Sequence, residues 1–387
     1  NSLFADLNER SVIPAGSTMT LDSLIDRYEA DPGRRPGAVK SRLKRDSELR
    51  LIREFFGRRT RLTDITRARC RSFMELLSKY PSNANKRFGD VSLTDAIALA
   101  EEKGLAPMAA TTANAYLATF NRLMEFAVQE QWIKDNPAKK LRIQGKRSYT
   151  KNGRDPFTVD ELNRIFRTPL YTGCRDDWQG YAIPGPAKPR RGRFWVPLLC
   201  LFHGMRLNEA CQLTCDDIVT MDGVDVILIR GTDDETKRVK TEAGQRFVPV
   251  HPEVAQIGFL AFVQNQRANG STSRLFPELG GSNATGYLSD PFSKWFARFL
   301  GKIGIHDSRK TFHSFRHTYR DALREADISI ERVRALGGWS TGNTEDRYGS
   351  GLRPSSLAAA IRQLQYAQLD LSHLHGASGT VTQMPSA

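Results

Sequence analysis

Apolar residues recur at helical spacing through much of the first third of the chain. In the segment 112–133, one face of a predicted helix carries Leu117, Phe120, Leu123, Met124 and Ala127. The stretches "TLDSLIDRYEA" and "LRLIREFFG" repeat this spacing. Pro137 is predicted to stop the last helix, because proline cannot continue it. We therefore predict a polar lead-in over residues 1–20 and an all-helical domain over residues 21–143.

The pattern changes after residues 144–155, which read as a basic, glycine-containing linker. Thr158 followed by Glu161 is typical of a capping box that starts a new helix. Residues 168–193 are rich in Gly, Pro and Arg and predict an irregular loop, followed by a helix through "WVPLLCLFHGMRLNEACQL". The β-branched runs "VDVILI" and "RFVPV" predict two strands of a small sheet.

The pattern is helical again from residue 252 to about residue 371. Within this region, Leu357, Ile361 and Leu364 predict a short amphipathic helix. The last sixteen residues are predicted to be disordered from their Gly, Ser, Thr and Pro content. We thus expect a mainly α chain with a small antiparallel β-sheet in a second domain over residues 156–350, followed by a C-terminal helix and tail over 351–387.

The charge of the chain favours a binding function. The 387 residues carry a net charge of +14, with a pI of about 9.7. An excess of this size attracts polyanions, although a solubilising surface is the alternative explanation. Seven basic residues without an acidic one follow each other around the linker, a run that suits a phosphate backbone: Lys139, Lys140, Arg142, Lys146, Arg147, Lys151 and Arg154.

Other classes of protein are disfavoured. The most apolar stretch, "FWVPLLCLF", is too short to span a membrane, and the start of the sequence has no signal-peptide pattern. The five cysteines form no C-x-x-C pair, so we expect buried free thiols rather than disulfides or a zinc site. These features predict a cytoplasmic protein of a cell without a nucleus.

The stretch "KTFHSFRHTYRDAL" groups two histidines, an arginine and a tyrosine on a predicted helix. His313 and Arg316 are three residues apart and share a face, which His317 borders. Tyr319 points about 120° away from His313 and is predicted to be a core or surface residue of the helix. A His–Arg pair suits an anionic oxygen centre such as a phosphate, although chance spacing on a surface helix would look the same.

Three further stretches contain residues in settings that favour chemistry. Arg206 follows a glycine turn, with Glu209 three residues on, either as its partner or as a surface pair. Lys240 lies in the stretch between the two predicted strands, where an exposed hairpin could reach into a cleft. Tyr348 lies in a glycine- and serine-rich segment, nine residues after Trp339.

Taken together, these residues resemble a tyrosine recombinase of the phage integrase family. The resemblance rests on Arg206 with Glu209 (R-x-x-E), Lys240, His313-x-x-Arg316, Trp339 and Tyr348. The gaps of 23 residues before Trp339 and nine after it are usual for that family. Two departures are the L-G-G-W text where most members have L-G-H, and His203 in place of a small residue before "GMR".

The resemblance implies DNA strand exchange without metal or nucleotide cofactor. Tyr348 would attack the scissile phosphodiester, forming a 3′-phosphotyrosyl bond and freeing a 5′-hydroxyl. Arg206 and Arg316 would bind the phosphate oxygens, and His313 would help to remove the tyrosine proton. Lys240, ahead of its rival Lys237, would protonate the departing oxygen.

The remaining implied roles are supporting ones. Trp339 would donate its indole N–H to the phosphate or pack behind the nucleophile. Glu209 would support the arginines, and His317 would support the site or simply pack.

The resemblance also implies partners and an architecture. A helical core-binding domain and an α+β catalytic domain would close on double-stranded DNA as a two-domain clamp. The protein would be a monomer in solution and a homotetramer on DNA, with a dimer at each recombination site. The C-terminal helix would pass to a neighbouring protomer, or else pack on its own domain. Accessory directionality or DNA-bending proteins are further candidate partners, and the expected location is a prokaryotic cytoplasm, with association to the nucleoid when the protein is bound to DNA.

Three alternatives use part of the same pattern. A type IB topoisomerase has nearly the same residue set, but the short two-domain layout and the C-terminal helix disfavour it. A catalytically silent DNA-binding protein could keep the fold. A relaxase-type nuclease is suggested by the "HLH" lettering of His373 to His375, but no tyrosine follows and no third metal ligand is apparent nearby.

Overall fold

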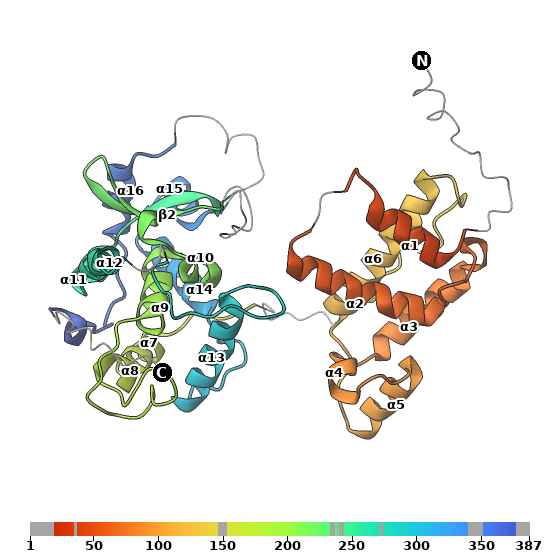
Figure 1. Cartoon of the computed structure of the whole chain (residues 1–387), viewed down its shortest axis with the longest axis horizontal. Helices are drawn as coiled ribbons and strands as arrows, with labels where there is room; N and C mark the ends of the chain where they lie inside the picture. The colour runs from red at the N-terminus through yellow and green to blue at the C-terminus, as the bar shows by residue number, and fades with distance from the viewer. Residues whose placement is uncertain are drawn as a thin grey trace, which may run out of the picture. The chain divides into compact units, whose positions relative to one another are not determined.

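The computed structural model describes residues 19–34, 37–145, 153–232, 237, 239, 244–270, 274–339 and 351–376. The chain divides into two compact units, Asn1–Thr150 and Lys151–Ala387, each built around its own hydrophobic core (Figure 1). We call them the N-terminal unit and the C-terminal unit. Among the helices that the structure describes, none has the length and apolar content needed to cross a bilayer.

The N-terminal unit is all-helical within its described residues (Figure 1). Its helices are α1 (Leu21–Ala30), α2 (Val39–Phe56), α3 (Arg67–Lys79), α4 (Ala84–Phe88), α5 (Leu93–Glu102) and α6 (Ala110–Gln129). Helix α6 is central and contacts α1, α2 and α3. The apolar face predicted for it is confirmed, because Leu117, Phe120, Leu123, Met124 and Ala127 are all buried.

The ends of these helices follow local chemistry. Side-chain oxygens of Thr20, Thr66 and Ser92 accept backbone N–H groups at the starts of α1, α3 and α5, over 3.3, 3.4 and 3.1 Å. The end predicted for α6 is wrong, because the helix stops at Gln129, well before Pro137. The chain turns there through Gln131, whose φ is +60°, so left-handed backbone rather than proline ends the helix.

The C-terminal unit combines helices with a small sheet. Its helices are α7 (Val159–Phe166), α8 (Pro169–Thr172), α9 (Gly192–His203), α10 (Leu207–Cys211), α11 (Pro252–Gln256), α12 (Phe259–Ala268), α13 (Ser289–Lys302), α14 (Ser314–Glu325), α15 (Ile330–Gly337) and α16 (Pro354–Ile361). Helix α9 is buried on every side, and α10, α11 and α14 pack against it. The capping box predicted from Thr158 and Glu161 is present at the start of α7.

The sheet has three antiparallel strands in the order β1 (Ile218–Met221), β2 (Val224–Ile229) and β3 (Arg246–Pro249). Strand β1 was not predicted, although Ile218, Val219 and Thr220 are all β-branched. Strand β2 pairs Ile227 with Ile218 on one side and with Val248 on the other. Helices α15 and α16 lie against β3, which links the sheet to the C-terminal part of the chain (Figure 1).

The described C-terminal residues pack on their own unit. Leu357, Ile361 and Leu364 are buried, and α16 contacts β2 and β3. Disorder over the last sixteen residues is a wrong prediction for Ser372–Leu374, which form a 3₁₀ turn with Leu374 buried. Residues 377–387 lie outside the described residues.

The five cysteines are free and buried, as predicted: Cys70, Cys174, Cys200, Cys211 and Cys215. Burial raises the pKa of every one of these thiols. At neutral pH all five are therefore protonated and unreactive.

Candidate active site

A tight glycine turn brings two of the predicted site residues together. Gly204 ends α9 with a φ of +59°. A Cβ atom there would lie 2.2 Å from Cδ1 of Tyr319, so only glycine fits between α9 and α14. The Gly204 carbonyl accepts a hydrogen bond from Nη1 of Arg316. Gly204 itself lies two residues before Arg206 in the sequence. The turn therefore fixes both arginines around one short backbone segment.

Arg206 is the residue that precedes α10, and Glu209 holds it on two sides. The Arg206 backbone N–H donates to Oε2 of Glu209 over 2.8 Å, and its Nη1 donates to Oε1 over 2.7 Å. The Arg206 side chain stays 25% exposed, whereas the Glu209 carboxylate is 2% exposed. The sequence pattern R-x-x-E thus gives a guanidinium that is anchored from inside and open to solvent on its outer edge.

A third arginine, which sequence reasoning missed, completes this arrangement. Arg246 at the start of β3 donates from Nη2 to Oε2 of Glu209 over 3.2 Å. It also donates to the carbonyl oxygens of Gly244, over 2.8 Å, and Leu336, over 3.0 Å. Burial alone would raise the pKa of Glu209, but Arg246 and the hydrogen bonds from Arg206 hold that pKa below its usual value. The carboxylate is therefore ionised.

Arg316 lies in the first turn of α14 and is only 5% exposed. Its Nη1 donates to the Gly204 carbonyl and its Nη2 to the Gly337 carbonyl, the latter over 2.5 Å. Burial, with the nearby Arg246 and Arg206, lowers the pKa of Arg316 to about 9, which leaves it charged at neutral pH. Three guanidinium groups thus lie near one carboxylate, to which only Arg206 and Arg246 bond, and the excess positive charge makes this a site for an anion.

His313 precedes α14 directly and accepts the Arg316 N–H at its backbone carbonyl over 3.1 Å. Its ring meets the ring of His317 edge-on, with 5.0 Å between centroids. Partial desolvation, together with His317, Arg316 and other cations, lowers the pKa of His313 to about 4. The imidazole is therefore neutral at physiological pH, in the form that can accept a proton.

Trp339 covers the arginines from the end of α15. The centroid of its indole lies 4.6 Å from Cζ of Arg316 and 5.3 Å from Cζ of Arg320. Its ring is also 6.5 Å from the ring of Tyr319. The indole therefore packs on the face of the buried guanidinium, where cation–π attraction supports its orientation.

Tyr319 is a core residue, which is one of the two positions that the helix-face argument allowed. Its side chain is fully buried, and burial raises the pKa of its hydroxyl. Among the described residues that hydroxyl has no hydrogen-bond partner. A phenol that is neither exposed nor easily ionised is a poor nucleophile.

Lys237 is held in a buried ion pair. Its Nζ donates to Oδ2 of Asp217 over 2.5 Å and to Oγ1 of Thr214 over 2.6 Å. Asp217 also accepts from Arg230 Nε over 3.0 Å. Lys240 and Tyr348, the residues predicted for the proton donor and the nucleophile, lie outside the described residues.

The C-terminal histidines are structural contacts. Nε2 of His373 lies 2.9 Å from the Phe166 carbonyl oxygen, and Nε2 of His375 lies 2.6 Å from Oε1 of Glu253. In the part of the chain that the structure describes, no group of His, Cys, Asp or Glu side chains could hold a metal ion.

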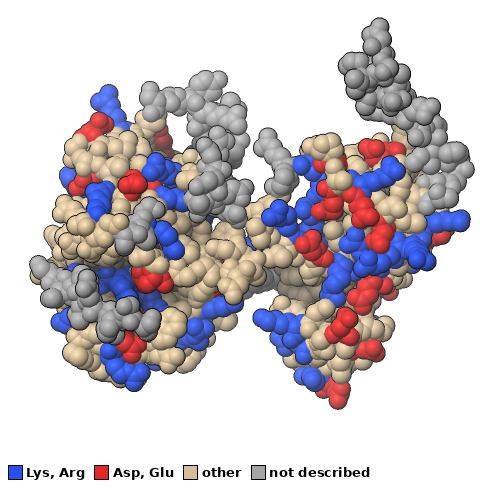
Figure 2. Space-filling model, viewed as in Figure 1, with Lys and Arg blue, Asp and Glu red and all other residues tan. Residues whose placement is uncertain are grey.

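The basic run near the linker is described only in part. Lys139, Lys140, Arg142 and Arg154 are exposed, and Arg154 also contacts Oγ1 of Thr311. Lys146, Arg147 and Lys151 lie outside the described residues. Figure 2 shows blue Lys and Arg side chains spread over the visible face of each unit, with red acidic side chains among them. The positive charge is therefore distributed over this face rather than gathered in one patch.

In a comparison with known protein families, the segment that carries this arginine cluster matches one family. Residues 190–351 match the Phage integrase family. This segment includes Arg206, Glu209, Arg246, His313 and Arg316. Comparison with curated proteins gives no match.

Two solved structures resemble the chain over most of its length. One is a lambda integrase dimer bound to a COC′ core site, which is 17% identical, with a TM-score of 0.53 over 91% of this chain and 98% of that chain. The other is the Tn1549 transposon integrase in complex with circular intermediate DNA, also 17% identical, with a TM-score of 0.56 over 88% of this chain and 99% of that chain. At these identities the likeness shows a shared fold.

Proposed function

We propose that this chain is a tyrosine-type site-specific DNA recombinase that integrates or excises a mobile genetic element, because residues 190–351 match the Phage integrase family. The observation that carries this proposal is the cluster of three arginines around the buried Glu209, with the neutral His313 beside it. Such a cluster suits a phosphodiester whose negative charge grows in the transition state. The reaction would need no metal or nucleotide cofactor.

Tyr348 is proposed as the nucleophile. Its oxygen would form a bond to the scissile phosphorus while the bond from phosphorus to the 5′-oxygen breaks. The bond energy is kept in the 3′-phosphotyrosyl link, so a 5′-hydroxyl of another strand can reverse the step. Arg206 and Arg316 would contact the non-bridging oxygens, and the exposed edge of Arg206 supports this role.

Two proton transfers accompany the exchange. His313 would accept the tyrosine proton, and its low pKa favours the neutral form required. Lys240 would give a proton to the departing 5′-oxygen. The alternative donor, Lys237, would first have to leave its buried ion pair with Asp217, which supports Lys240 for this role.

Trp339 and the supporting residues would shape the site. The indole packs on Arg316, so its proposed role is to hold that guanidinium and to exclude water from it. Its N–H could also donate to the phosphate. Glu209 would keep Arg206 in position, and His317 would pack against His313.

The DNA-binding proposal involves both units. Lambda integrase and the Tn1549 integrase are named in complexes with DNA, and we propose double-stranded DNA as the partner here. Lys139, Lys140, Arg142 and Arg154 are exposed and suited to phosphate contacts, which would make the affinity steeply dependent on salt. With Lys146, Arg147 and Lys151 they would follow the backbone while the two units close on the duplex.

We propose further that the protein acts as a tetramer on DNA, in a prokaryotic cytoplasm, with accessory proteins that set its direction. Exchange of the C-terminal helix between protomers competes with the packing of α16 on its own unit. Deletion of residues 352–387 separates the two. Synapsis that survives the deletion would exclude helix exchange.

The experiment that tests the function is covalent trapping. Fragmented DNA from the source organism is incubated with the full chain in EDTA and quenched with SDS, and the protein-linked fragments are sequenced. The adduct peptide is mapped by mass spectrometry, with Tyr348→Phe as the negative control. We expect an adduct on Tyr348 at recurring DNA ends.

Other outcomes would favour the alternatives. Relaxation of any supercoiled plasmid, without a preferred site, indicates a type IB topoisomerase. DNA binding at low salt with no adduct indicates a catalytically silent binding protein. Loss of the adduct in EDTA indicates a metal-dependent nuclease.

A further inference from the structure

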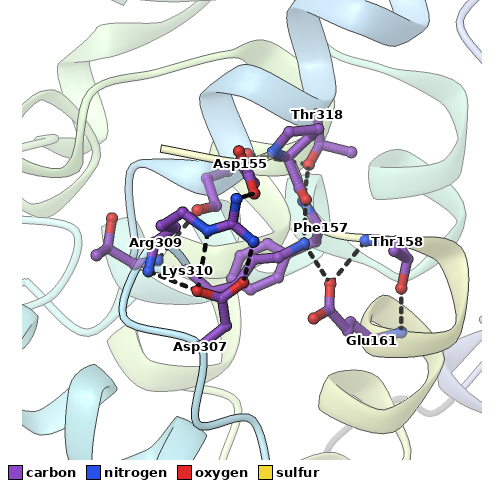
Figure 3. Close-up of polar contacts among 11 residues, drawn as sticks. Asp155, Phe157, Thr158, Glu161, Asp307, Arg309, Lys310 and Thr318 are labelled. Carbon is purple, nitrogen blue, oxygen red and sulfur yellow. Dashed lines mark hydrogen bonds and ion pairs between the residues drawn. The ribbon is translucent and has the colours of Figure 1, made fainter. Parts of the chain in front are cut away.

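A short segment at the start of the C-terminal unit lies across the loop that leads to His313 (Figure 3). We call residues 154–158 the strap and residues 306–312 the loop. The Asp155 N–H donates to the Arg309 carbonyl over 3.3 Å, and Arg154 donates to Oγ1 of Thr311. Strap and loop are about 150 residues apart in sequence, so their contact is a tertiary feature of the fold.

Lys310 is the buried centre of this contact. Its Nζ donates to Oε2 of Glu161 over 2.8 Å and to the carbonyl of Pro156 (Figure 3). The same Glu161 oxygen accepts the Thr158 N–H over 2.8 Å, as part of the capping box of α7. The start of α7 and the loop before α14 are therefore joined through one carboxylate.

The contact continues to the backbone next to His313. The Phe157 N–H donates to Oγ1 of Thr318 over 2.8 Å, and this hydroxyl donates to the Ser314 carbonyl over 2.9 Å. On the other side, the Thr311 N–H donates to Oγ of Ser314 over 3.0 Å. The turn that carries His313 is thus held on both sides.

These contacts of the turn are important because few other contacts orient the His313 imidazole. Within the described residues no hydrogen bond reaches the His313 ring, and its ring–ring contact there is edge-on with His317. The direction of the ring therefore depends on the backbone of the turn. We propose that Lys310, through its partly buried ion pair with Glu161, is a positioning residue that orients His313 toward the reacting phosphate. The inference rests on the proposed function.

Arg309 provides a matched comparison. It is the neighbouring basic residue of the loop, and its ion pairs with Asp307, over 3.1 Å, and Asp155, over 3.0 Å, lie at the surface. The Arg309 side chain is 60% exposed and that of Lys310 is 8% exposed. Exposed ion pairs contribute little to stability, whereas removing one partner of a buried pair leaves the other charge uncompensated and is costly.

The test compares Lys310→Met and Glu161→Gln with Arg309→Met in the full chain. The rate of adduct formation is measured at saturating concentrations of a nicked duplex made from the trapped site. We expect Lys310→Met to slow adduct formation about tenfold with unchanged DNA affinity, a part of what a proton acceptor contributes. Arg309→Met should change the rate less than about twofold. Glu161→Gln keeps an acceptor for Thr158 and should lie between them.

The decisive arm repeats Lys310→Met in a His313→Ala background. If Lys310 acts only by orienting the His313 ring, its substitution should not slow the reaction further once that ring is absent. The same slowing in both backgrounds, or an equal effect of Arg309→Met, would overturn the proposal.

A readout independent of activity keeps this test separate from the proposed function. The His313 ring is titrated by NMR in the full chain without DNA. We expect the pKa of His313 to rise toward its ordinary value in Lys310→Met and to stay unchanged in Arg309→Met. An unchanged titration would count against Lys310 even in an active protein, whereas a wild-type chain that forms no adduct would count against the recombinase function alone.

Discussion

The two units of the molecule bury very different kinds of side chain. Among the described residues of the N-terminal unit, the buried polar side chains are Glu48 and Thr119, which bond to each other over 2.5 Å. The C-terminal unit buries Glu209, Arg316 and further charged groups, and Arg316 bonds only to backbone carbonyls in the described structure. The first unit thus has an apolar core, and the second contains a charged centre within its core.

This difference separates binding from chemistry. Burying a charge is costly unless other groups compensate it, so a charged cluster is retained where its field acts on a ligand. In the proposed function, the N-terminal unit would need only surface charge to follow a phosphate backbone. We therefore expect substitutions of buried charge to affect the reaction in the C-terminal unit and only stability in the N-terminal unit.

The largest effect is expected from Arg316→Lys. A lysine cannot donate to the Gly204 and Gly337 carbonyls together, and it lacks the planar face that Trp339 covers. Adduct formation should fall by about 10²- to 10³-fold, as for loss of an oxyanion donor. Arg320→Lys is the control, because Arg320 contacts the same indole from an exposed position. A similar loss in both variants would assign the effect to Trp339.

A paired substitution of glutamates compares the two units directly. Glu209→Gln leaves Arg206 and Arg246 without a counter-charge and should cost about 3 kcal/mol in the free energy of unfolding. Glu48→Gln keeps a neutral acceptor for Thr119 and should cost roughly 1 kcal/mol. Urea unfolding gives both values, and the adduct rate should fall only in Glu209→Gln. Equal losses of activity would break the comparison.

Acid should weaken the C-terminal unit first, because all seven histidines lie after residue 150. Burial lowers the pKa of His203 to about 3, and its Nε2 accepts the His251 N–H over 3.0 Å. Since the unfolded chain takes up this proton near pH 6.5, stability is lost as the pH falls below that value, by about 1.4 kcal/mol at pH 5.5.

Hydrogen exchange at pH 7.5 and 5.5, corrected for intrinsic rates, checks this by separating the two units. Amides of α9 should lose protection and amides of α6 should keep theirs. A parallel loss in both helices would assign the acid effect to other groups.

The smallest effect is expected from Tyr319→Phe. The Tyr319 hydroxyl is buried without a partner among the described residues, so its removal should leave stability unchanged or raise it by up to about 1 kcal/mol. Tyr366→Phe is the control, because its hydroxyl donates to the Leu201 carbonyl over 2.7 Å and its loss should cost about 1 kcal/mol. Thermal unfolding measures both. Loss of the adduct in Tyr319→Phe would contradict the assignment of Tyr319 to the core.

The sequence predicted those parts of the fold that local chemistry controls. The apolar face of α6 and the capping box at Thr158 needed only spacing and residue type. The glycine turn before Arg206 was also predicted from residue type, although the helix predicted around it runs through the turn that separates α9 from α10. The end of α6 was misplaced because a left-handed residue, Gln131, gives a weaker signal than a proline.

The candidate site divides in the same way. A spaced motif named Arg206, Glu209, His313 and Arg316, and the structure brings them together. Arg246 was missed because a single arginine at the start of a strand has no spacing to mark it. The contact of Lys310 with Glu161 spans 149 residues, and neither residue type indicates its partner in the sequence.

The burial of all five native thiols has a practical consequence. A thiol-reactive dye at neutral pH finds no exposed native cysteine thiol, so the wild-type protein is expected to remain unlabelled. One added cysteine in each unit, as in Ser78→Cys with Lys302→Cys at exposed positions, would carry a pair of fluorophores. The distance between the two units could then be followed optically while DNA is bound, cut and released.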